Sequence, residues 1–453
     1  GIAGIILAIG MGVDANVITA ERIKEELRSG KSLDGALKSG FARGLTPIID
    51  GNVTIVIVAV VLMGAFGPSD GFFAKMLHFV FFAFGPSTAG TIYAFGYTLL
   101  TGVLLNFVFG VFATRVMIRG AAAIKALRDP WLYGADRPGK EPAEKKPIDF
   151  VGLRKRFLTI SSCLMAVILL CAVVFGVRLD TEFTGGAMIT LSYEGEFTTA
   201  DVQKTASAAL GSKDLTLQTG SDISGNQTLT VTLPGSQTLT TEQLDDMLTA
   251  INEAHPENNF EQNEVSNVDA TIGKEFMLKS IVALVAACVL ILLYVAYRFR
   301  RIGGLKAGST AIVALLHDML VVFGVFVILR IPLNGNFIAA LLTILGYSIN
   351  DTVVIYDRIR ENSALYSKKQ LSLAELVNLS INQSFARSLM TSITTCLALG
   401  VVCIISVIYR LDSIYSFAFP LLFGMVSGVY STICIATPLW VDWKTKKKAA
   451  KQA

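Results

Sequence analysis

The sequence predicts a polytopic α-helical membrane protein with about nine spans and one α+β, ferredoxin-like domain outside the membrane. Three observations lead to this fold class. The chain has 453 residues, of which 53% are hydrophobic and 16% charged, whereas soluble proteins carry about 25% charged residues. The apolar residues gather in runs of about 18 or more, long enough to cross ~30 Å of hydrocarbon as helices. A single long segment, 178–270, is polar.

The apolar runs define the expected spans. They lie at roughly 1–20, 46–66, 88–113, 157–177, 276–297, 308–329, 336–356, 389–409 and 414–440. A shorter apolar segment, 71–84, is bounded by Gly-Pro pairs, and we expect it to lie in the interface or to re-enter rather than span. Because the chain opens inside an apolar run with Gly1 and not Met, we expect further spans and an outer domain upstream.

The charges of the connecting segments give an orientation. Basic residues gather in alternate connections: 21–45, 115–156, 298–306, 358–369 and 444–451. By the positive-inside rule these segments face the cytoplasm, which places residue 1 and the polar segment 178–270 outside. The segment 129–149 is rich in proline and charge and is expected to be a cytoplasmic linker.

The polar segment alternates strand-like and helix-like patterns. AMITLSY, TADVQKTASAAL, LTLQT, QTLTVTL and TEQLDDMLTAINEA follow one another, and an extended tail comes last. This β-α-β-β-α-β order predicts a ferredoxin-like sandwich. All six cysteines lie in apolar runs outside it, so no disulfide framework is indicated.

The chain contains an internal repeat. GMGVDANVITAERIKE at 10–25 aligns with GYSINDTVVIYDRIRE at 346–361, and the Phe-Ala-Arg of SGFARGLTPI aligns with that of QSFARSLMTS. Two such halves are a common transporter plan with the working site at their interface. The alignment pairs Asp14 with Asn350, Arg22 with Arg358, Glu25 with Glu361 and Arg43 with Arg387.

The repeat and the charge pattern divide the chain into parts. They are the last three spans of a first half (1–128), the linker (129–149), the first span of a second half (150–177), the outer domain (178–270), a five-span bundle (271–443) and a basic cytoplasmic tail (444–453).

Asp351 is an ionisable residue inside an apolar span. Such a charge costs roughly 2.5–3.5 kcal/mol on insertion scales, so it indicates function. Arg387, at the start of the next span, is its expected partner, and Thr391, Thr394 and Thr395 follow on one polar helix face. This combination predicts a carboxylate that couples proton movement to motion.

Further intramembrane polar residues are expected to support Asp351. Asp14 is the acidic residue of the first half, and the supporting residues are Asn16, Asn350, Thr391, Thr395, His317 and Asp318. Asp50 lies near the inner end of the second span. A structural interpretation stays open for all of them, because buried polar pairs also fix helix packing.

Several of these stretches resemble a known family. GMGVDANVITAERIKEELR resembles the SecD signature, whereas GYSINDTVVIYDRIREN, ALLHD, RSLMTSITT and FTGGAMI resemble SecF. The chain is thus similar to the SecD/SecF protein-export membrane proteins, of the resistance–nodulation–division superfamily. Where that family usually has Asp-Phe before a Gly-Gly pair, this chain has Glu182-Phe183.

The resemblance implies a function. It implies an accessory subunit of the Sec translocase in the bacterial cytoplasmic membrane that uses the proton-motive force to assist export on the outer side. It implies the SecYEG channel, the emerging preprotein, SecA indirectly and YajC as partners. It implies no enzymatic activity and no cofactor beyond the proton gradient, with sodium left open as coupling ion. The family's proton-path residues correspond to Asp14, Asp351 and Arg387.

Three other functions compete with this one. A proton-driven efflux transporter of small molecules or lipids would share the intramembrane carboxylates, and a structural scaffold of the translocon would need none of them. An intramembrane aspartyl protease is disfavoured because Val13 separates Gly12 from Asp14 in the segment that would carry its second motif. We expect no metal site, since only three histidines occur and they lie far apart in sequence.

Overall fold

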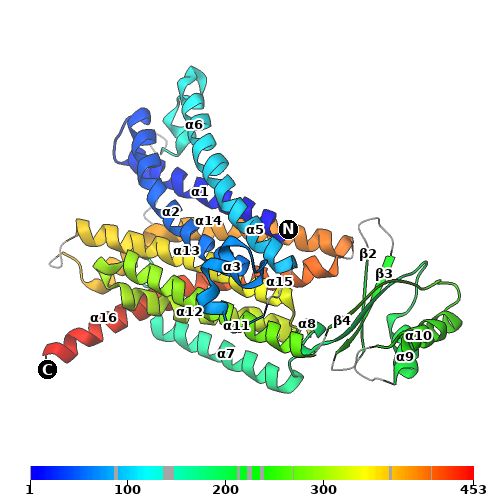
Figure 1. Cartoon of the computed structure of the whole chain (residues 1–453). Helices are drawn as coiled ribbons and strands as arrows, with labels where there is room; N and C mark the ends of the chain where they lie inside the picture. Colours follow the sequence, from blue (N-terminus) through cyan, green and yellow to red (C-terminus); the bar gives the residue numbers. More distant parts are fainter. Residues whose placement is uncertain are drawn as a thin grey trace.

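A computed structural model of the chain confirms the expected fold class. It describes residues 2–85, 90–135, 147–211, 215–221, 227–234, 239–268, 270–366, 370–409 and 411–452. Among these residues, eight helices are long and apolar enough to cross a membrane. Helix α1 (Ile2–Arg28) covers the remaining expected span. The polar domain projects from one end of the helical bundle, and the C-terminal helix points away at the other end (Figure 1).

The first half of the repeat contains three long helical segments. Helix α1 is followed by α2 (Leu33–Phe66), which begins where Ser32 Oγ accepts a hydrogen bond from the Gly35 amide at 3.3 Å. Helix α5 (Gly90–Leu105) continues through a π-helical segment, η1 (Asn106–Ala113), into α6 (Thr114–Ala123).

The segment expected at the interface forms two short helices. They are α3 (Phe72–Met76) and α4 (His78–Phe81), and neither is long enough to span a bilayer. The one-turn elements η2 (Lys125–Leu127) and η3 (Pro130–Tyr133) follow α6. Of the expected linker, residues 136–146 lie outside the described residues.

The second half is a six-segment bundle. Its helices are α7 (Arg154–Phe175), α11 (Ala270–Arg298), α12 (Gly304–Ile328), α13 (Gly335–Leu365), α14 (Leu373–Ile408) and α15 (Asp412–Ser431), with the short η4 (Arg300–Ile302) after α11. Helix α15 continues through the π-helical η5 (Thr432–Ala436) into α16 (Thr437–Gln452), so the expected basic tail is helical as far as Gln452. Ser372 and Glu375 form a capping box that starts α14.

The outer domain has the expected β-α-β-β-α-β order. Its elements are β1 (Gly186–Ser192), α9 (Thr199–Leu210), β2 (Thr216–Ser221), β3 (Gln227–Pro234), α10 (Thr241–Ala254) and β4 (Glu261–Val268). The sheet is antiparallel in the order β2-β3-β1-β4, which is the ferredoxin-like arrangement. Alternate residues of β1, such as Ile189 and Leu191, are buried with Met247 of α10. The extended segment that the sequence predicts after the second helix forms the edge strand β4.

A short helix, α8 (Thr181–Thr184), ties the outer domain to the bundle. Leu179 pairs with Leu333 in a parallel bridge just before α13. The Gly335 amide at the start of α13 donates to Glu182 Oε2 at 2.5 Å. Burial raises the pKa of Glu182, and this amide opposes that shift. Glu182 therefore accepts a hydrogen bond from the first residue of α13.

Helix α13 is the central element of the bundle and contacts both halves. It packs against α2 and α15. Thr54 Oγ1 of α2 donates to the Gly346 carbonyl of α13 at 3.2 Å. A Cβ on Gly51 would lie 1.7 Å from Asn350 Oδ1, so a larger residue at this crossing would have to displace the Asn350 amide. The close contact of α2 with α13 brings the two repeats together at the middle of the membrane.

Candidate functional site

Two intramembrane carboxylates, one from each half, line a single small cavity. Asp14 comes from α1 and Asp351 from α13, and Tyr347, Thr391 and Thr395 contribute hydroxyl groups to its wall. The cavity measures about 30 Å³, which exceeds the roughly 10–15 Å³ that one water molecule needs. It therefore has room for water beside the carboxylates.

Asp14 is held by hydrogen bonds from two helices of the second half. Asn350 Nδ2 donates to Asp14 Oδ2 at 2.8 Å, and Thr391 Oγ1 donates to Oδ1 at 3.1 Å. Asp14 is 8% exposed. These bonds satisfy both carboxylate oxygens and fix the side chain toward the second half.

Asp351 has a different environment although it follows Asn350 directly. Within the described part of the chain, its carboxylate takes part in no hydrogen bond and no ion pair, and it lines the cavity. A charged carboxylate in a low-dielectric site is costly without a partner. Of the two carboxylates, Asp351 is therefore the one that no direct partner within the described residues stabilises.

Arg387 lies near the two carboxylates but forms no ion pair with either among the described residues. Its Nε and Nη2 atoms are buried and have no hydrogen-bond partner there. Its charge interacts electrostatically with Asp14 and Asp351. The guanidinium lines a second cavity of about 20 Å³, beside Arg22 and Arg358 at the cytoplasmic side. The structure thus lacks the expected ion pair with Asp351, because the two side chains line different cavities.

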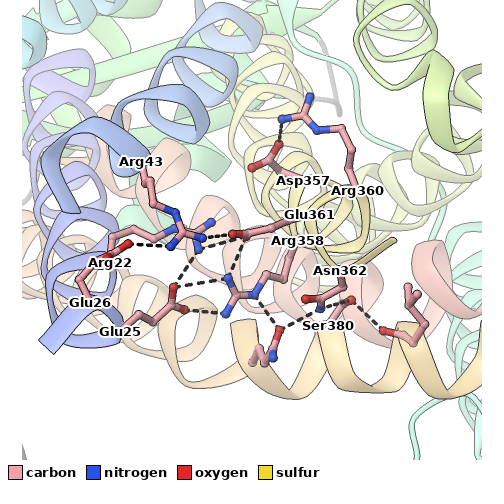
Figure 2. A network of polar contacts seen from close by, with 12 residues as sticks. Arg22, Glu25, Glu26, Arg43, Asp357, Arg358, Arg360, Glu361, Asn362 and Ser380 are labelled. Carbon is pink, nitrogen blue, oxygen red and sulfur yellow. Dashed lines mark hydrogen bonds and ion pairs between the residues drawn. The ribbon is translucent and has the colours of Figure 1, made fainter. Parts of the chain in front are cut away.

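Four charged side chains form a ring of ion pairs next to Arg387 (Figure 2). Arg22 contacts Glu25 at 2.9 Å and Glu361 at 3.1 Å. Arg358 contacts Glu361 at 2.9 Å and Glu25 at 2.6 Å. Each arginine therefore pairs with the glutamate of its own helix and with the glutamate of the other repeat. We call these four residues the charge ring.

Arg43 extends the charge ring on the first half. It contacts Glu26 at 2.6 Å and also pairs with Glu361. Glu26 is 3% exposed and pairs with Lys31 as well, at 2.5 Å. Figure 2 shows Arg43 pointing from α2 toward α13. The basic residue that aligns with Arg387 is thus fully paired.

His317 and Asp318 belong to a separate polar cluster between α12, α13 and α15. Asp318 is fully buried and accepts hydrogen bonds from Ser348 at 2.6 Å, Ser427 at 2.6 Å and Ser431 at 2.7 Å. His317 Nδ1 lies 3.2 Å from the same carboxylate. The cluster does not line the cavity of Asp14 and Asp351, so the structure places these two residues apart from the two carboxylates.

The remaining expected residues divide between the cavity and the helix surfaces. Thr395 lines the cavity, whereas the Thr394 hydroxyl donates to the Met390 carbonyl of its own helix. Asn16 Oδ1 is buried and has no partner within the described residues. The expected polar stripe on α14 therefore reaches the cavity through Thr391 and Thr395.

Two features were missed by sequence reasoning. Tyr347 lines the cavity and donates to the Leu7 carbonyl of α1; it precedes Asp351 by four residues, and that helical spacing could have identified it. Asp50 pairs with Arg298 of α11 at 2.6 Å. No local signal links those two residues, because they lie on helices far apart in sequence.

The described residues offer no metal centre. Among them, no group of three or more His, Cys, Asp or Glu side chains is placed to hold a metal ion. The chemistry available at the site is therefore that of carboxylates, hydroxyls and one guanidinium.

Comparisons with known proteins agree on one family. The model of the protein export membrane protein SecD/SecF, C-terminal, matches residues 247–446. The protein translocase subunit SecDF of Bacillus subtilis is 31% identical over 99% of this chain and 57% of its own length. The protein translocase subunit SecF of Alicyclobacillus acidocaldarius is 34% identical over 68% of this chain and 97% of its own length.

A solved structure shows the same fold. The crystal structure of SecDF from Thermus thermophilus has a TM-score of 0.77 and 30% identity, covering 98% of this chain and 55% of that one. The chain spans about half the length of the curated SecDF relatives that it matches.

Proposed function

Because the chain belongs to the SecD/SecF family of membrane proteins, which lie in the bacterial cytoplasmic membrane, we propose that it works in an accessory subunit of the Sec protein translocase. In this proposal, the protein uses the proton gradient to assist movement of an exported chain on the outer side of the membrane. Its partners are the SecYEG channel and the emerging preprotein, with SecA acting from the other side and YajC as a further subunit.

One observation carries this proposal: Asp14 and Asp351, from the two repeats, line the same water-sized cavity. A group that binds a proton at the interface of two halves couples proton passage to their relative motion. Moving one charge through 100 mV yields about 2.3 kcal/mol, enough to bias such a motion. Asp351 is the proton-binding group, and Asp14, held by Asn350 and Thr391, is the fixed charge beside it.

Arg387 and the charge ring complete the mechanism. When Asp351 is ionised, its charge attracts the unpaired guanidinium of Arg387; when it is protonated, that attraction is lost. Arg387 therefore moves between the cavity and the charge ring. The charge ring, which joins α1 to α13 through both repeats, separates the cavity from the cytoplasm until Arg387 moves.

The first test is the variant Asp351→Asn in the whole protein. Inverted membrane vesicles with matched amounts of wild type and variant would be followed through completion of preprotein translocation, with and without a proton gradient. We expect the gradient-dependent step to vanish in the variant. A sodium gradient in place of the proton gradient tests the other coupling ion.

The matched control is Asp50→Asn. Asp50 is another carboxylate inside an apolar span, but it is 5% exposed and pairs with Arg298 outside the cavity. We expect this variant to lose stability and to keep the gradient-dependent step. If Asp351→Asn folds, inserts and translocates like the wild type, Asp351 is a packing residue and the protein is a scaffold of the translocon.

A further inference from the structure

A cationic cavity lies at the cytoplasmic end of α11, away from the carboxylates. It measures about 440 Å³ and is lined by Tyr297, Arg298, Arg300, Arg301 and Arg360. The four arginines come from two separate segments, the end of α11 with η4 and the cytoplasmic end of α13. The cavity is therefore suited to an anion.

Half of this positive charge is not compensated by protein carboxylates. Arg298 is paired with Asp50 at 2.6 Å, and Arg360 is paired with Asp357. Arg300 and Arg301 are exposed and have no carboxylate within 4.0 Å among the described residues. The Arg300 guanidinium stacks over the Tyr297 ring at 5.6 Å. Two positive charges at the cavity remain for a ligand.

An exposed apolar stripe on α11 leads to the same cavity. Its residues are spaced four apart, so they form one continuous ridge that is inclined to the axis of α11. They are Ile281, Val285, Val289, Leu293 and Tyr297, with exposed fractions of 49, 56, 47, 57 and 72%. Tyr297 belongs to both the stripe and the cavity wall. A ligand with an anionic head and an apolar tail could contact both together.

We propose that this cavity binds the phosphate headgroup of an anionic phospholipid from the cytoplasmic leaflet, with one acyl chain lying along the stripe. Arginine side chains bind phosphate oxygens in pairs, and basic pockets at this side of membrane helices suit anionic headgroups. A soluble phosphate would fill the same cavity but gain nothing from the stripe. This site is independent of the proton-coupling residues of the proposed function.

The test compares lipid binding by two paired variants of the purified whole protein. Arg300→Gln/Arg301→Gln removes the two uncompensated charges of the cavity. Lys155→Gln/Arg156→Gln removes two adjacent exposed charges at the cytoplasmic end of α7, which do not line this cavity. Native mass spectrometry would measure binding of phosphatidylglycerol and phosphatidylcholine to each.

We expect wild type to prefer phosphatidylglycerol and the cavity variant to bind it roughly thirtyfold more weakly, since each cation near an anionic headgroup contributes about fivefold. The control variant should bind like the wild type, and Arg300→Lys/Arg301→Lys should keep most of the binding. Equal losses in both glutamine variants would show general surface attraction and overturn the proposal. So would displacement of the lipid by inorganic phosphate alone, which would mark a site for a soluble anion.

Discussion

The two repeats use the same aligned positions for different purposes. In the first repeat, Arg43 pairs with Glu26 and with Glu361, and both of its partners are acidic. In the second repeat, the position of Glu26 is occupied by Asn362, whose amide donates to Ser380 and Gln383. Arg387, the counterpart of Arg43, thereby lacks the acid that would hold it. The counterpart of the other partner, Glu25, is present but pairs with Arg22 and Arg358 instead.

A similar asymmetry separates the two aspartates. Asp14 aligns with Asn350, and Asp351 aligns with Ala15, so the copies place their carboxylates at adjacent positions. The consequence is that Asn350 binds Asp14 across the interface while Asp351 stays without a direct partner in the described chain. The two copies of one motif therefore place a hydrogen-bonded carboxylate and, within the described chain, an unpaired carboxylate at adjacent aligned positions.

The largest expected effect comes from removing Arg387, with Arg43 as its matched control. Arg387→Gln should abolish the gradient-dependent part of translocation, by tenfold or more, because the proposed moving charge is gone. Arg43→Gln should keep that step and lose only about 1 kcal/mol of stability, since Lys31 still compensates Glu26. Vesicle translocation and thermal unfolding measure the two outcomes. Equal loss of the gradient-dependent step in both variants would mean that the two aligned arginines have the same role in translocation.

A smaller effect is expected where the helices of the two repeats touch. Gly51→Ala would place a methyl group on Asn350 and push its amide away from Asp14. We expect about 1–3 kcal/mol of destabilisation from overpacking. Gly44→Ala, on the same helix, would meet its nearest atom at 3.5 Å, an ordinary contact, and should be neutral or stabilising. Melting temperatures of the two variants test this pair; a stable Gly51→Ala would show that the Asn350 contact can be rearranged.

The bundle could be predicted from the sequence because burial in a bilayer is a local property. A run of apolar residues and a basic flank are visible without knowledge of neighbours. The outer domain could also be predicted, because segments with the hydrophobic periodicity of strands and of helices alternate in a recognisable order. Asp351 stood out for the same reason, as a charge inside an apolar run.

The contacts of the site could be predicted only in part. The repeat aligned Arg22 with Arg358 and Glu25 with Glu361, and these four residues do meet, as the charge ring. The hydrogen bond of Thr391 to Asp14 and the separation of Arg387 from Asp351 depend on how α1 and α14 pack. That packing depends on contacts such as Gly10 of α1 against Thr395 of α14, which no local pattern encodes.

The smallest expected effect lies on the outer side of the second repeat, at Glu182. Burial raises the pKa of this carboxyl, so the folded protein retains its proton to a higher pH than the unfolded chain does. The stabilisation from the protonated carboxyl is therefore complete below the ordinary glutamate pKa of about 4.3. It is lost as the pH rises through the raised pKa of the folded protein. Glu182→Gln is neutral at every pH and should remove this dependence.

Melting temperatures over a pH series would measure the effect of Glu182 as the difference between wild type and variant. We expect wild type to lose stability relative to Glu182→Gln as the pH rises from about 4.3. The change should end once the pH exceeds the raised pKa of Glu182 in the folded protein. The amide hydrogen bond from Gly335 favours the ionised form and limits the size of the change. A difference in melting temperature that stays constant with pH would show that Glu182 is solvated and that its protonation does not affect the stability of the protein.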